Sequence, residues 1–575
     1  MHNPRMFQPL GRSSFSNLVL AISLLLPLIG TAHAQVTYTN SSTSGAVSWS
    51  TGPNWSATPL SASNTAIRFQ GALGGTLSIT QDTGANFVLN ALTNANTGGG
   101  AMNFTGGAFE FSKSGTTDPV LTFSTSRTNI QTFSNDFVLN ARLAVGQSSA
   151  TVSNSTIAGV ISGAGGLRKS GNGYVYLTGT NNSFGGGVTT SAGTLFVGSI
   201  GNAGANSSLG TNGTIAMGDG SGANALRTIN AVEEVSDKAI SLGGSTINTR
   251  IENYSGGVLT LNGAINTVTN AGKVLYIVAK SNNVVLGGSI ATTNAANNNL
   301  ALFLTNSAGK TLTLTASNAF RRGVTIESGI LEAAHPASLG NGGVNLAPTV
   351  PDGAILKVSY DGSGGVLGNL LLQNDAIIDA GSSPASSISF ATATNWTAGK
   401  ILTVSNSTVG RIYITNTNDV PLDHIKSAEF PTYSASLDSA GLLEFLPPPP
   451  SGTTYVGWLA SAGARATPES LFEYAYGAPV PGSADSQYSP AMTVRGEMLV
   501  LTYHVRQGAI GLTVSPEVSV ALDGPGAGFG PSVLLTDVST GPISANGVLL
   551  DRREASIPIS SLGAKAFLRV VVAHE

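Results

Sequence analysis

Short runs of alternating apolar and polar residues recur from Gln35 to Phe445, separated by clusters of Gly, Asn, Ser and Thr. Ala108-Phe109-Glu110-Phe111 and Leu402-Thr403-Val404 are examples. Alternation with closely spaced turn residues indicates β-strands, because successive side chains of a strand point to opposite faces. Hardly any window has the i, i+3, i+4 apolar spacing of a helix. The pattern therefore predicts an all-β protein with many tight turns.

One segment of this pattern occurs twice, at an offset of 136 positions. The first copy comprises Asn182, Phe184, Val188, Thr189, Gly193 and Leu195, with Ser208-Leu209-Gly210 after it. The second copy comprises Asn318, Phe320, Val324, Thr325, Gly329 and Leu331, with Ser338-Leu339-Gly340 after it. Because Phe and Leu are among the matches, low complexity does not explain the fixed offset, and the recurrence indicates repeated structural units.

Units made only of strands and turns predict a right-handed parallel β-helix, a solenoid, over residues 35–445. In such a fold each turn hydrogen-bonds to the next, inward apolar side chains stack, and Gly forms corners with positive φ. With roughly 20–25 residues per turn and about 4.8 Å between turns, the rod would be on the order of 80–100 Å long. We expect Trp49 and Trp55 to cap the first turn, because an uncovered strand edge templates association.

The stretch from Gly163 to Leu195 resembles the autotransporter-associated β-strand repeat. Its opening, Gly166-Leu167-Arg168-Lys169-Ser170-Gly171-Asn172-Gly173, is similar to the family's Gly-Leu-x-Lys-x-Gly-x-Gly. The sequence departs from the family at Val188 and Thr190, and the second copy has Arg321-Arg322 in place of family glycines. Residues 376–404 are similar to the region that closes such repeat arrays. The resemblance implies a secreted or surface-displayed passenger-type β-helix with no catalytic residues to carry over.

A proline-rich linker over residues 446–453 separates the repeats from a small β-rich domain over residues 454–575. Pro447 to Pro450 predicts an extended polyproline segment. After a helical pattern at 467–476, apolar runs predict a small β-sandwich with strands at 498–503, 510–514, 518–522 and 567–572. A true autotransporter barrel needs roughly 250 residues, so we expect none after this linker.

Residues 1–34 have the features of a secretory signal peptide. Arg5 and Arg12 precede an apolar run over 18–30, and Ala32-His33-Ala34 supplies a cleavage pattern, so we expect cleavage near Ala34. The run falls short of the roughly 20 residues of a membrane-spanning helix, which argues against an integral membrane protein. The mature chain would be secreted or held at the outer cell surface, and it would need separate export machinery.

The composition narrows the function further. Of 575 residues, 10% are charged, 72 are Gly and none is Cys. Helical bundles and TIM barrels normally carry more charge and less Gly, and the absence of Cys excludes disulfides and thiolate metal sites. The formal net charge is −3 and no basic patch is present, so we expect no nucleic-acid partner. A weakly charged polar surface is typical of a secreted protein that contacts glycans.

The sequence offers few candidates for catalysis. The histidines beyond residue 34 are scattered, and we find no nucleophile or phosphate-loop motif; these histidines are His335, His424, His504 and His574. A polysaccharide lyase or glycoside hydrolase would need paired carboxylates, for which the candidates are Asp375 with Asp379 and Asp419 with Asp423. Two such residues on one strand lie about 13 Å apart, which favours turn caps and rim charges.

Two further residue groups have both a structural and a binding interpretation. Asp219-Gly220 and Asp361-Gly362 primarily predict turns, and weak calcium binding is the alternative interpretation. Tryptophans in a β-rich chain usually pack against the core, although exposed indoles stack on sugars; those here are Trp49, Trp55, Trp396 and Trp458. We therefore assign no catalytic, cofactor-binding or metal residue.

The sequence thus favours a non-enzymatic exported protein that serves in adhesion, glycan contact or an extracellular matrix scaffold. The alternative is a carbohydrate-active enzyme, a polysaccharide lyase or glycoside hydrolase, built on the same β-helix. The alternative requires acidic or basic side chains that converge in one groove.

Overall fold

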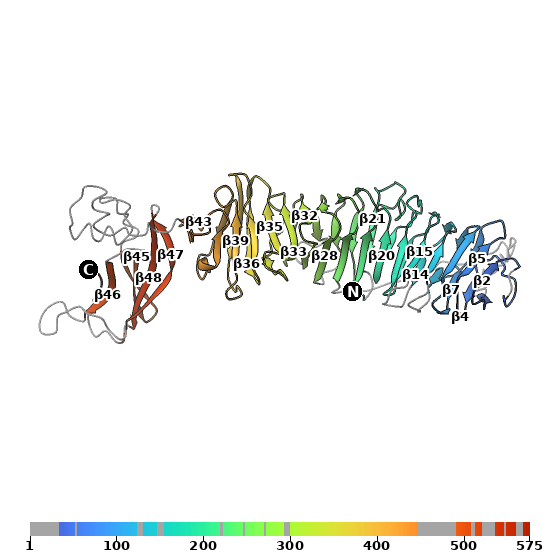
Figure 1. Cartoon of the computed structure of the whole chain (residues 1–575), viewed down its shortest axis with the longest axis horizontal. Helices are drawn as coiled ribbons and strands as arrows, with labels where there is room; N and C mark the ends of the chain where they lie inside the picture. The colour runs from blue at the N-terminus through green and yellow to red at the C-terminus, as the bar shows by residue number, and fades with distance from the viewer. Residues whose placement is uncertain are drawn as a thin grey trace, which may run out of the picture.

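A computed structural model describes residues 34–51, 54–123, 130–146, 154–218, 222–244, 248–268, 272–292, 299–446, 490–507, 512–519, 535–545, 548–558, 560 and 567–574. Within these ranges the protein is an all-β rod followed by a small β-module (Figure 1). The predicted signal peptide before Ala34, the Pro447–Pro450 linker and the helical pattern at 467–476 lie outside the described residues. No helix in the described part is long and apolar enough to cross a membrane.

The rod is a parallel β-helix of about 14 turns, as the sequence predicts. Its first sheet has eleven parallel strands, each hydrogen-bonded to the strand one turn away. They are β1 (Val36–Asn40), β3 (Thr65–Phe69), β7 (Ala91–Asn94), β11 (Val120–Thr122), β14 (Leu143–Gly146), β17 (Leu167–Ser170), β19 (Val188–Thr190), β21 (Thr214–Met217), β24 (Ala239–Leu242), β27 (Ile265–Thr267) and β30 (Ile290–Thr292).

A second parallel sheet follows the first in every turn and extends further along the rod. It comprises β2 (Gly45–Ser48), β5 (Leu77–Gln81), β9 (Met102–Gly106), β12 (Gln131–Phe133), β15 (Asn154–Ile157), β18 (Tyr174–Leu177), β20 (Gly193–Val197), β22 (Asn224–Thr228), β25 (Asn248–Asn253), β28 (Lys273–Ala279), β31 (Leu300–Thr305), β33 (Val324–Ala333), β34 (Val344–Leu346) and β36 (Gly362–Leu372). Strands β38 (Ser386–Thr392) and β40 (Arg411–Ile414) continue from β36. A two-stranded pair, β4 (Ala72–Leu73) with β8 (Thr97–Gly98), lies between these two sheets along the chain.

Shorter strands complete each turn after the second sheet. Near the N-terminal end they are β6 (Phe87–Leu89), β10 (Phe109–Phe111), β13 (Phe137–Leu139) and β16 (Ile161–Ser162). Further along they are β23 (Glu234–Ser236), β26 (Leu259–Leu261), β29 (Val284–Leu286), β32 (Thr311–Leu314), β35 (Ala354–Val358), β37 (Ala376–Asp379), β39 (Leu402–Ser405) and β41 (Ile425–Ser427). One continuous apolar core runs inside the coil from Tyr38 to Leu443.

The rod is shorter than the sequence estimate. Successive strands of the first sheet begin at Val36, Thr65, Ala91 and Val120, so a turn there takes more than 25 residues. Fourteen turns at the spacing of neighbouring strands give a length of about 65 Å. Loops between the strands lengthen each turn, and fewer turns therefore fit into residues 35–445.

The sequence recurrence corresponds to the same corner in two turns. Asn182 Oδ1 accepts the Ile161 N–H at 2.8 Å and its Nδ2 donates to the Ser208 carbonyl at 3.1 Å. Asn318 does the same with Ile290 at 2.7 Å and Ser338 at 2.6 Å. Each buried Asn therefore connects its turn by hydrogen bonds to the turns before and after it. This role explains why the residue recurs.

Strand β33 belongs to two sheets at once. Its first part, Val324 to Ile326, pairs with β31 and β34 of the second sheet. Its last part, Ile330 to Ala333, pairs with β32 and β35 of the third. A register shift after Leu304 marks the bend between the two parts. In other turns a corner separates the strand of the second sheet from the strand of the third. Here one long strand continues through that corner.

Aromatic side chains close the N-terminal turn. Trp49 is fully buried, and its ring centroid lies 5.6 Å from Trp55, 5.3 Å from Phe87 and 5.2 Å from Phe109. The Trp55 indole Nε1 donates to the Ser48 carbonyl at 3.0 Å. These contacts fit the predicted cap.

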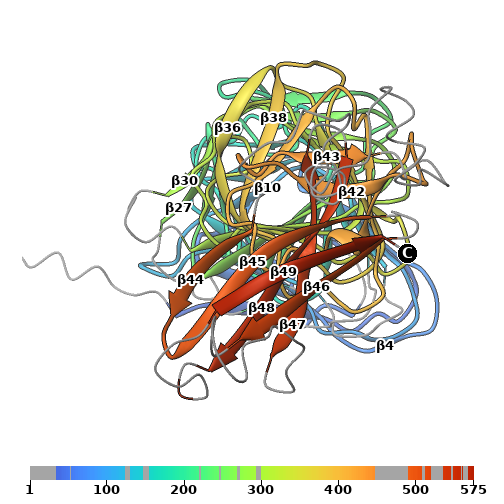
Figure 2. The ribbon, with the colours of Figure 1, turned by 90° about the vertical axis from the view of Figure 1, so that its left-hand side faces the viewer.

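At the other end one turn of 3₁₀ helix, η2 (Leu422–His424), precedes the last coil strand, β41, and an antiparallel hairpin of β42 (Ser434–Leu437) and β43 (Leu443–Leu446) follows it. The module beyond has a four-stranded sheet, β44 (Ala491–Arg495), β45 (Met498–Arg506), β48 (Val548–Pro558) and β47 (Thr536–Ala545), and a two-stranded sheet, β46 (Leu512–Ser519) with β49 (Phe567–His574). Figure 2 looks onto this module. The core of the module consists of Leu501, Tyr503, Ala555 and Ile557. Val514 and Val570 of the two-stranded sheet pack against this core.

The module is compatible with the predicted sandwich, but its strands differ in detail. Residues 512–514 and 518–519 of the two predicted runs belong to one strand, β46, which continues through Pro516, while 510–511 and 520–522 lie outside the described residues. Strands β47 and β48 were not predicted, because polar and charged residues interrupt their apolar pattern. Ion pairs from Arg553 to Asp537 at 2.9 Å and to Asp551 at 3.1 Å stabilise them instead.

Candidate functional site: an aromatic and arginine surface on the rod

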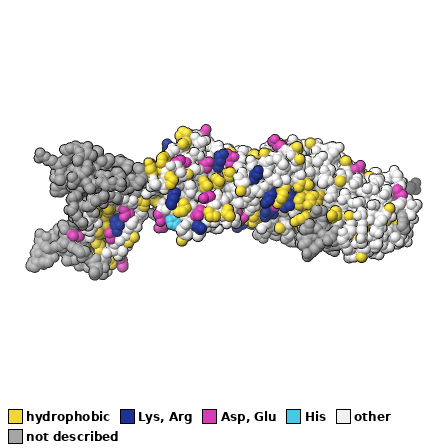
Figure 3. Space-filling model, in the orientation of Figure 1, with side chains coloured by type: hydrophobic (Ala, Val, Ile, Leu, Met, Phe, Trp, Pro, Cys, Tyr) yellow, Lys and Arg dark blue, Asp and Glu magenta, His cyan; other side chains and the backbone are white. Residues whose placement is uncertain are grey.

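Aromatic and arginine side chains, with one glutamate between the arginines, gather on the outer face of the second sheet. We call this set the aromatic-arginine surface; it comprises Tyr174, Tyr176, Phe196, Arg227, Arg250, Glu252, Tyr254, Tyr276 and Phe303. Figure 3 shows apolar side chains beside Lys and Arg side chains on this part of the rod, over β20 and β28. The surface spans six neighbouring strands, from β18 to β31.

Strand alternation places these residues outside the coil. In β18 and β20 the inward positions Val175 and Leu195 are fully buried, so the residues next to them face outward. The interstrand register then aligns Tyr176 with Phe196, and Phe196 with Arg227. Arg227 is aligned in turn with Glu252. One outward row therefore carries two aromatic rings followed by an ion pair.

The aromatic rings contact one another along the rod. Tyr176 and Phe196 are stacked, with centroids 4.1 Å apart and planes at 13°. Tyr174 meets the Phe196 ring edge-on at 5.3 Å, and Tyr276 lies 5.2 Å from Phe303. Burial raises the pKa of the Tyr176 hydroxyl above its ordinary value, so this group remains a hydrogen-bond donor at neutral pH. These half-buried tyrosines combine a flat apolar face with a polar edge.

Glu252 lies beneath the two arginines. Its side chain is 4% exposed, and it pairs with Arg227 at 2.5 Å and with Arg250 at 2.8 Å. The Arg227 guanidinium lies over two rings, 4.7 Å from the Phe196 centroid and 4.1 Å from the Tyr254 centroid. Arg250 lies 4.9 Å over Tyr276. Ion pairing and ring contacts together hold both guanidinium planes in fixed orientations.

The carboxylates of the first candidate pair, Asp375 just before β37 and Asp379 at its end, serve as structural caps. Asp375 accepts the Ile401 N–H at 2.8 Å. Asp379 accepts the Gly381 N–H at 3.0 Å and the Asn406 Nδ2 at 2.7 Å. Each carboxylate bridges a corner to the next turn, in agreement with the turn-cap interpretation.

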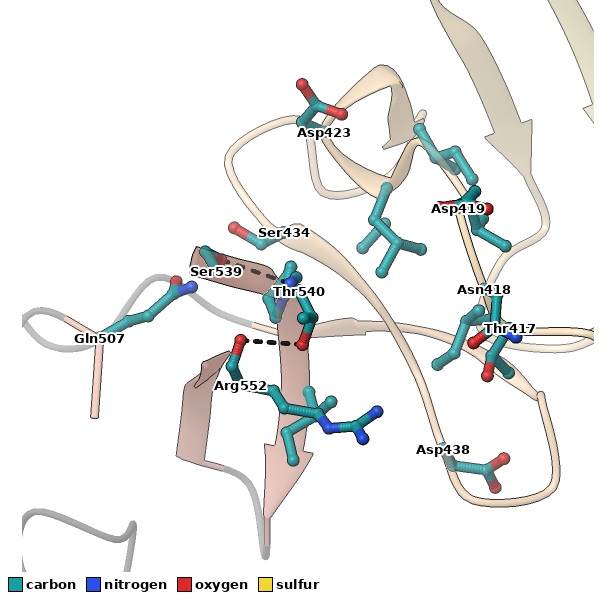
Figure 4. A pocket seen from close by; sticks show the side chains of 18 of the residues that line it. Thr417, Asn418, Asp419, Asp423, Ser434, Asp438, Gln507, Ser539, Thr540 and Arg552 are labelled. Carbon is teal, nitrogen blue, oxygen red and sulfur yellow. Dashed lines mark hydrogen bonds between the residues drawn. The ribbon is translucent and has the colours of Figure 1, made fainter. Parts of the chain in front are cut away.

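The second candidate pair lines a cleft of about 1680 Å³ between the last turn of the rod and the module (Figure 4). Asp419 and Asp423 lie on the rod side, and Arg495 and Arg552 on the module side. Figure 4 shows the two carboxylates pointing in different directions. Asp423 is 83% exposed in its side chain, so it lacks the apolar surroundings typical of a general acid. The two carboxylates therefore line the same cleft but are not directed at one common point.

The remaining candidates from the sequence are the two Asp-Gly turns and the tryptophans Trp396 and Trp458. Gly362 has φ 97°, as expected for the Asp361-Gly362 turn, whereas residues 219–221 lie outside the described ranges. No group of three or more His, Asp or Glu side chains that could hold a metal ion occurs in the described residues. The Trp396 Nε1 donates to the Leu370 carbonyl at 2.8 Å, and the ring packs against the core. Trp458 lies outside the described residues.

The aromatic-arginine surface contains no Trp and no pair of carboxylates, the residue types from which the sequence predicts a sugar site. A signal was present in the strand pattern itself. In Tyr174-Val175-Tyr176 and in Tyr276 of β28, aromatic residues occupy the positions that alternate with the core. The outward-facing positions of solenoid strands are normally polar. Aromatic residues at these positions therefore mark a candidate contact surface.

Comparison with known proteins gives one informative similarity. The chain is 32% identical over 235 residues to the adhesin BmaC autotransporter of Brucella suis biovar 1 (strain 1330). The match covers 38% of this chain and 7% of that much longer protein. No family model matches the chain, and no solved structure matches it. The similarity agrees with an autotransporter-type passenger, while the specific repeat family stays a prediction.

Proposed function

We propose that this chain is an exported, non-enzymatic surface protein whose β-helix contributes to adhesion by binding glycans through the aromatic-arginine surface. The observation that carries the proposal is the set of partly exposed rings between β18 and β31, namely Tyr174, Tyr176, Tyr254, Tyr276 and Phe303, in which Tyr176 stacks at 4.1 Å on the buried Phe196. Aromatic faces bind the apolar faces of pyranose rings, while Tyr hydroxyls and Arg donate to sugar hydroxyls. Similarity to a named adhesin supports the same class of function.

The rod geometry fits a long ligand. Neighbouring strands are about 4.8 Å apart, so six strands present a track of about 24 Å from β18 to β31. A track of this length favours an oligosaccharide segment over a single sugar. The fixed backbone of the coil keeps the rings in place before binding, which lowers the entropic cost of association.

Binding assays on mature protein beginning at Gln35 test the proposal. We expect it to bind one or more immobilised polysaccharides, and the Tyr176→Ala/Tyr276→Ala variant to bind at least about tenfold more weakly. Tyr413→Ala is the matched control, because Tyr413 faces outward from β40 of the same rod. Its affinity should stay within about twofold of wild type.

Two results would count against the proposal. One is the absence of binding to any glycan in a panel of plant, algal and animal polysaccharides. The other is binding that the double variant and the control reduce equally. Analysis of the same incubations for new reducing or unsaturated ends tests the enzymatic alternative, for which we expect no cleavage.

A further inference from the structure

The charges within the aromatic-arginine surface indicate which glycans it recognises. Resting on the function proposed above, we infer that the ligand is an anionic oligosaccharide, with a carboxylate or sulfate ester bound by Arg227 and Arg250. The rings on either side would then hold neighbouring sugar units. The inference draws on the charge balance of the surface, the unused donors of its arginines and the order of residues along the rod.

The surface carries a net positive charge in a chain whose formal net charge is −3. Two arginines face one carboxylate, and Glu252 is 4% exposed behind them. Both oxygens of Glu252 are occupied, Oε2 by Arg227 and Oε1 by Arg250. An approaching ligand therefore meets guanidinium groups first, and the buried carboxylate offsets only one of the two charges.

The arginines retain donors that point to no acceptor among the described residues. Arg250 reaches Glu252 through Nε, and its side chain is 38% exposed. Arg227 uses Nε and one Nη group. A guanidinium has five N–H donors in a planar fork that matches carboxylate and sulfate oxygens. The unused Nη groups therefore form a binding site for such an anion.

Aromatic rings flank the arginines on both sides along the rod. Tyr176, the buried Phe196, Arg227 and Glu252 are aligned in one outward row of successive strands. Arg250, Tyr276 and Phe303 are aligned in the neighbouring row, further along the rod. A chain running parallel to the rod axis would stack sugar rings at both ends and place an acidic group in the middle. This order distinguishes the surface from a simple basic patch, which would bind any polyanion.

A comparison of three ligand classes at two salt concentrations tests the inference. The probes are neutral xylo-oligosaccharides, oligogalacturonates, and sulfated carrageenan oligosaccharides of similar length. We expect at least one acidic class to bind about tenfold or more tightly than the neutral one, with affinity falling as NaCl rises from 50 to 500 mM. Comparison of the two acidic classes identifies the anion.

Variants assign the effect to the arginines. Arg250→Gln leaves Glu252 paired with Arg227, so the fold should persist, as far-UV circular dichroism would verify. We expect this variant to lose the preference for acidic ligands while it keeps residual binding to neutral ones. Arg411→Gln is the charge-matched control, because Arg411 is exposed on β40 of the same rod, and it should behave as wild type.

The outcomes separate this inference from the proposed function. Equal affinity for neutral and acidic ligands would overturn the inference and leave glycan binding intact. Absence of binding to every probe would overturn both. An acidic preference that survives Arg250→Gln, or that Arg411→Gln reduces to the same extent, would overturn the assignment to these arginines.

Discussion

Replacement of Asn182 by Ala tests the structural reason for the sequence recurrence. In the folded protein this buried side chain accepts the Ile161 N–H at 2.8 Å and donates to the Ser208 carbonyl at 3.1 Å and the Gly179 carbonyl at 3.2 Å. The Ala variant leaves these groups without that partner inside the coil. Each buried polar group left unsatisfied costs about 1–3 kcal/mol.

We therefore expect Asn182→Ala to destabilise the local turns by about 2–4 kcal/mol, one well-buried N–H and one carbonyl accounting for most of this loss. In a solenoid each turn contacts mainly its neighbours, so the effect should be local. Hydrogen exchange measured by mass spectrometry is the appropriate assay. Protection of the Ile161 amide and of the peptide around Ser208 should fall by about 30-fold or more.

Two further variants make the experiment decisive. Asn318→Ala should give the same loss at Ile290 and Ser338, because it forms the equivalent bonds. Asn181→Ala is the control, since Asn181 is exposed and makes a single side-chain contact with Asn206 at 2.8 Å. Unchanged exchange in Asn182→Ala, or an equal effect of Asn181→Ala, would refute the reasoning.

Three other substitutions, the first with a matched control, probe the coil. Gly210→Ala should cost more than about 1–2 kcal/mol in urea unfolding, because φ is +70° and the new Cβ would lie 2.3 Å from the Phe184 carbonyl oxygen, whereas Gly185→Ala, with open space around it, should change stability by less than about 0.5 kcal/mol. Burial lowers the pKa of Lys169 from 10.5 to about 7. Between these two pH values the amine is protonated in the unfolded chain and neutral in the folded one, so the free energy of unfolding of the wild type should increase with pH. In Lys169→Met the urea denaturation midpoint should no longer increase over this pH range. Trp49→Ala should cost about 3–5 kcal/mol and promote end-to-end association on size-exclusion chromatography, and a monomeric variant of unchanged stability would contradict the cap.

The solenoid could be predicted because its determinants are local. Alternating apolar residues, Gly at corners and a recurring Asn each act within one turn or between neighbouring turns, as Asn182 and Gly210 show. The aromatic-arginine surface could not be predicted in the same way. Loops of unequal length separate Tyr176, Phe196 and Arg227 in the sequence, so their alignment becomes visible only with the interstrand register.

The module shows a second limit of sequence reasoning. Strand β48 contains Asp551, Arg552, Arg553 and Glu554 in succession, a run that has the composition of a loop. It forms a strand because β45 and β47 pair with it on both sides and its charges find partners across the sheet. Tertiary pairing overrides local propensity here.

Strand β33 has a mechanical consequence for a rod attached to a target at one point and to a cell at another. Tension along the axis separates turns by breaking the hydrogen bonds between neighbouring strands. At most turns the sheets can open one after another, because a corner lets each strand pivot. At β33 the second and third sheets share a single strand, so β34 and β35 cannot be pulled from it independently. This turn divides the rod into two segments, and we expect a stretched molecule to yield on one side of it before the other.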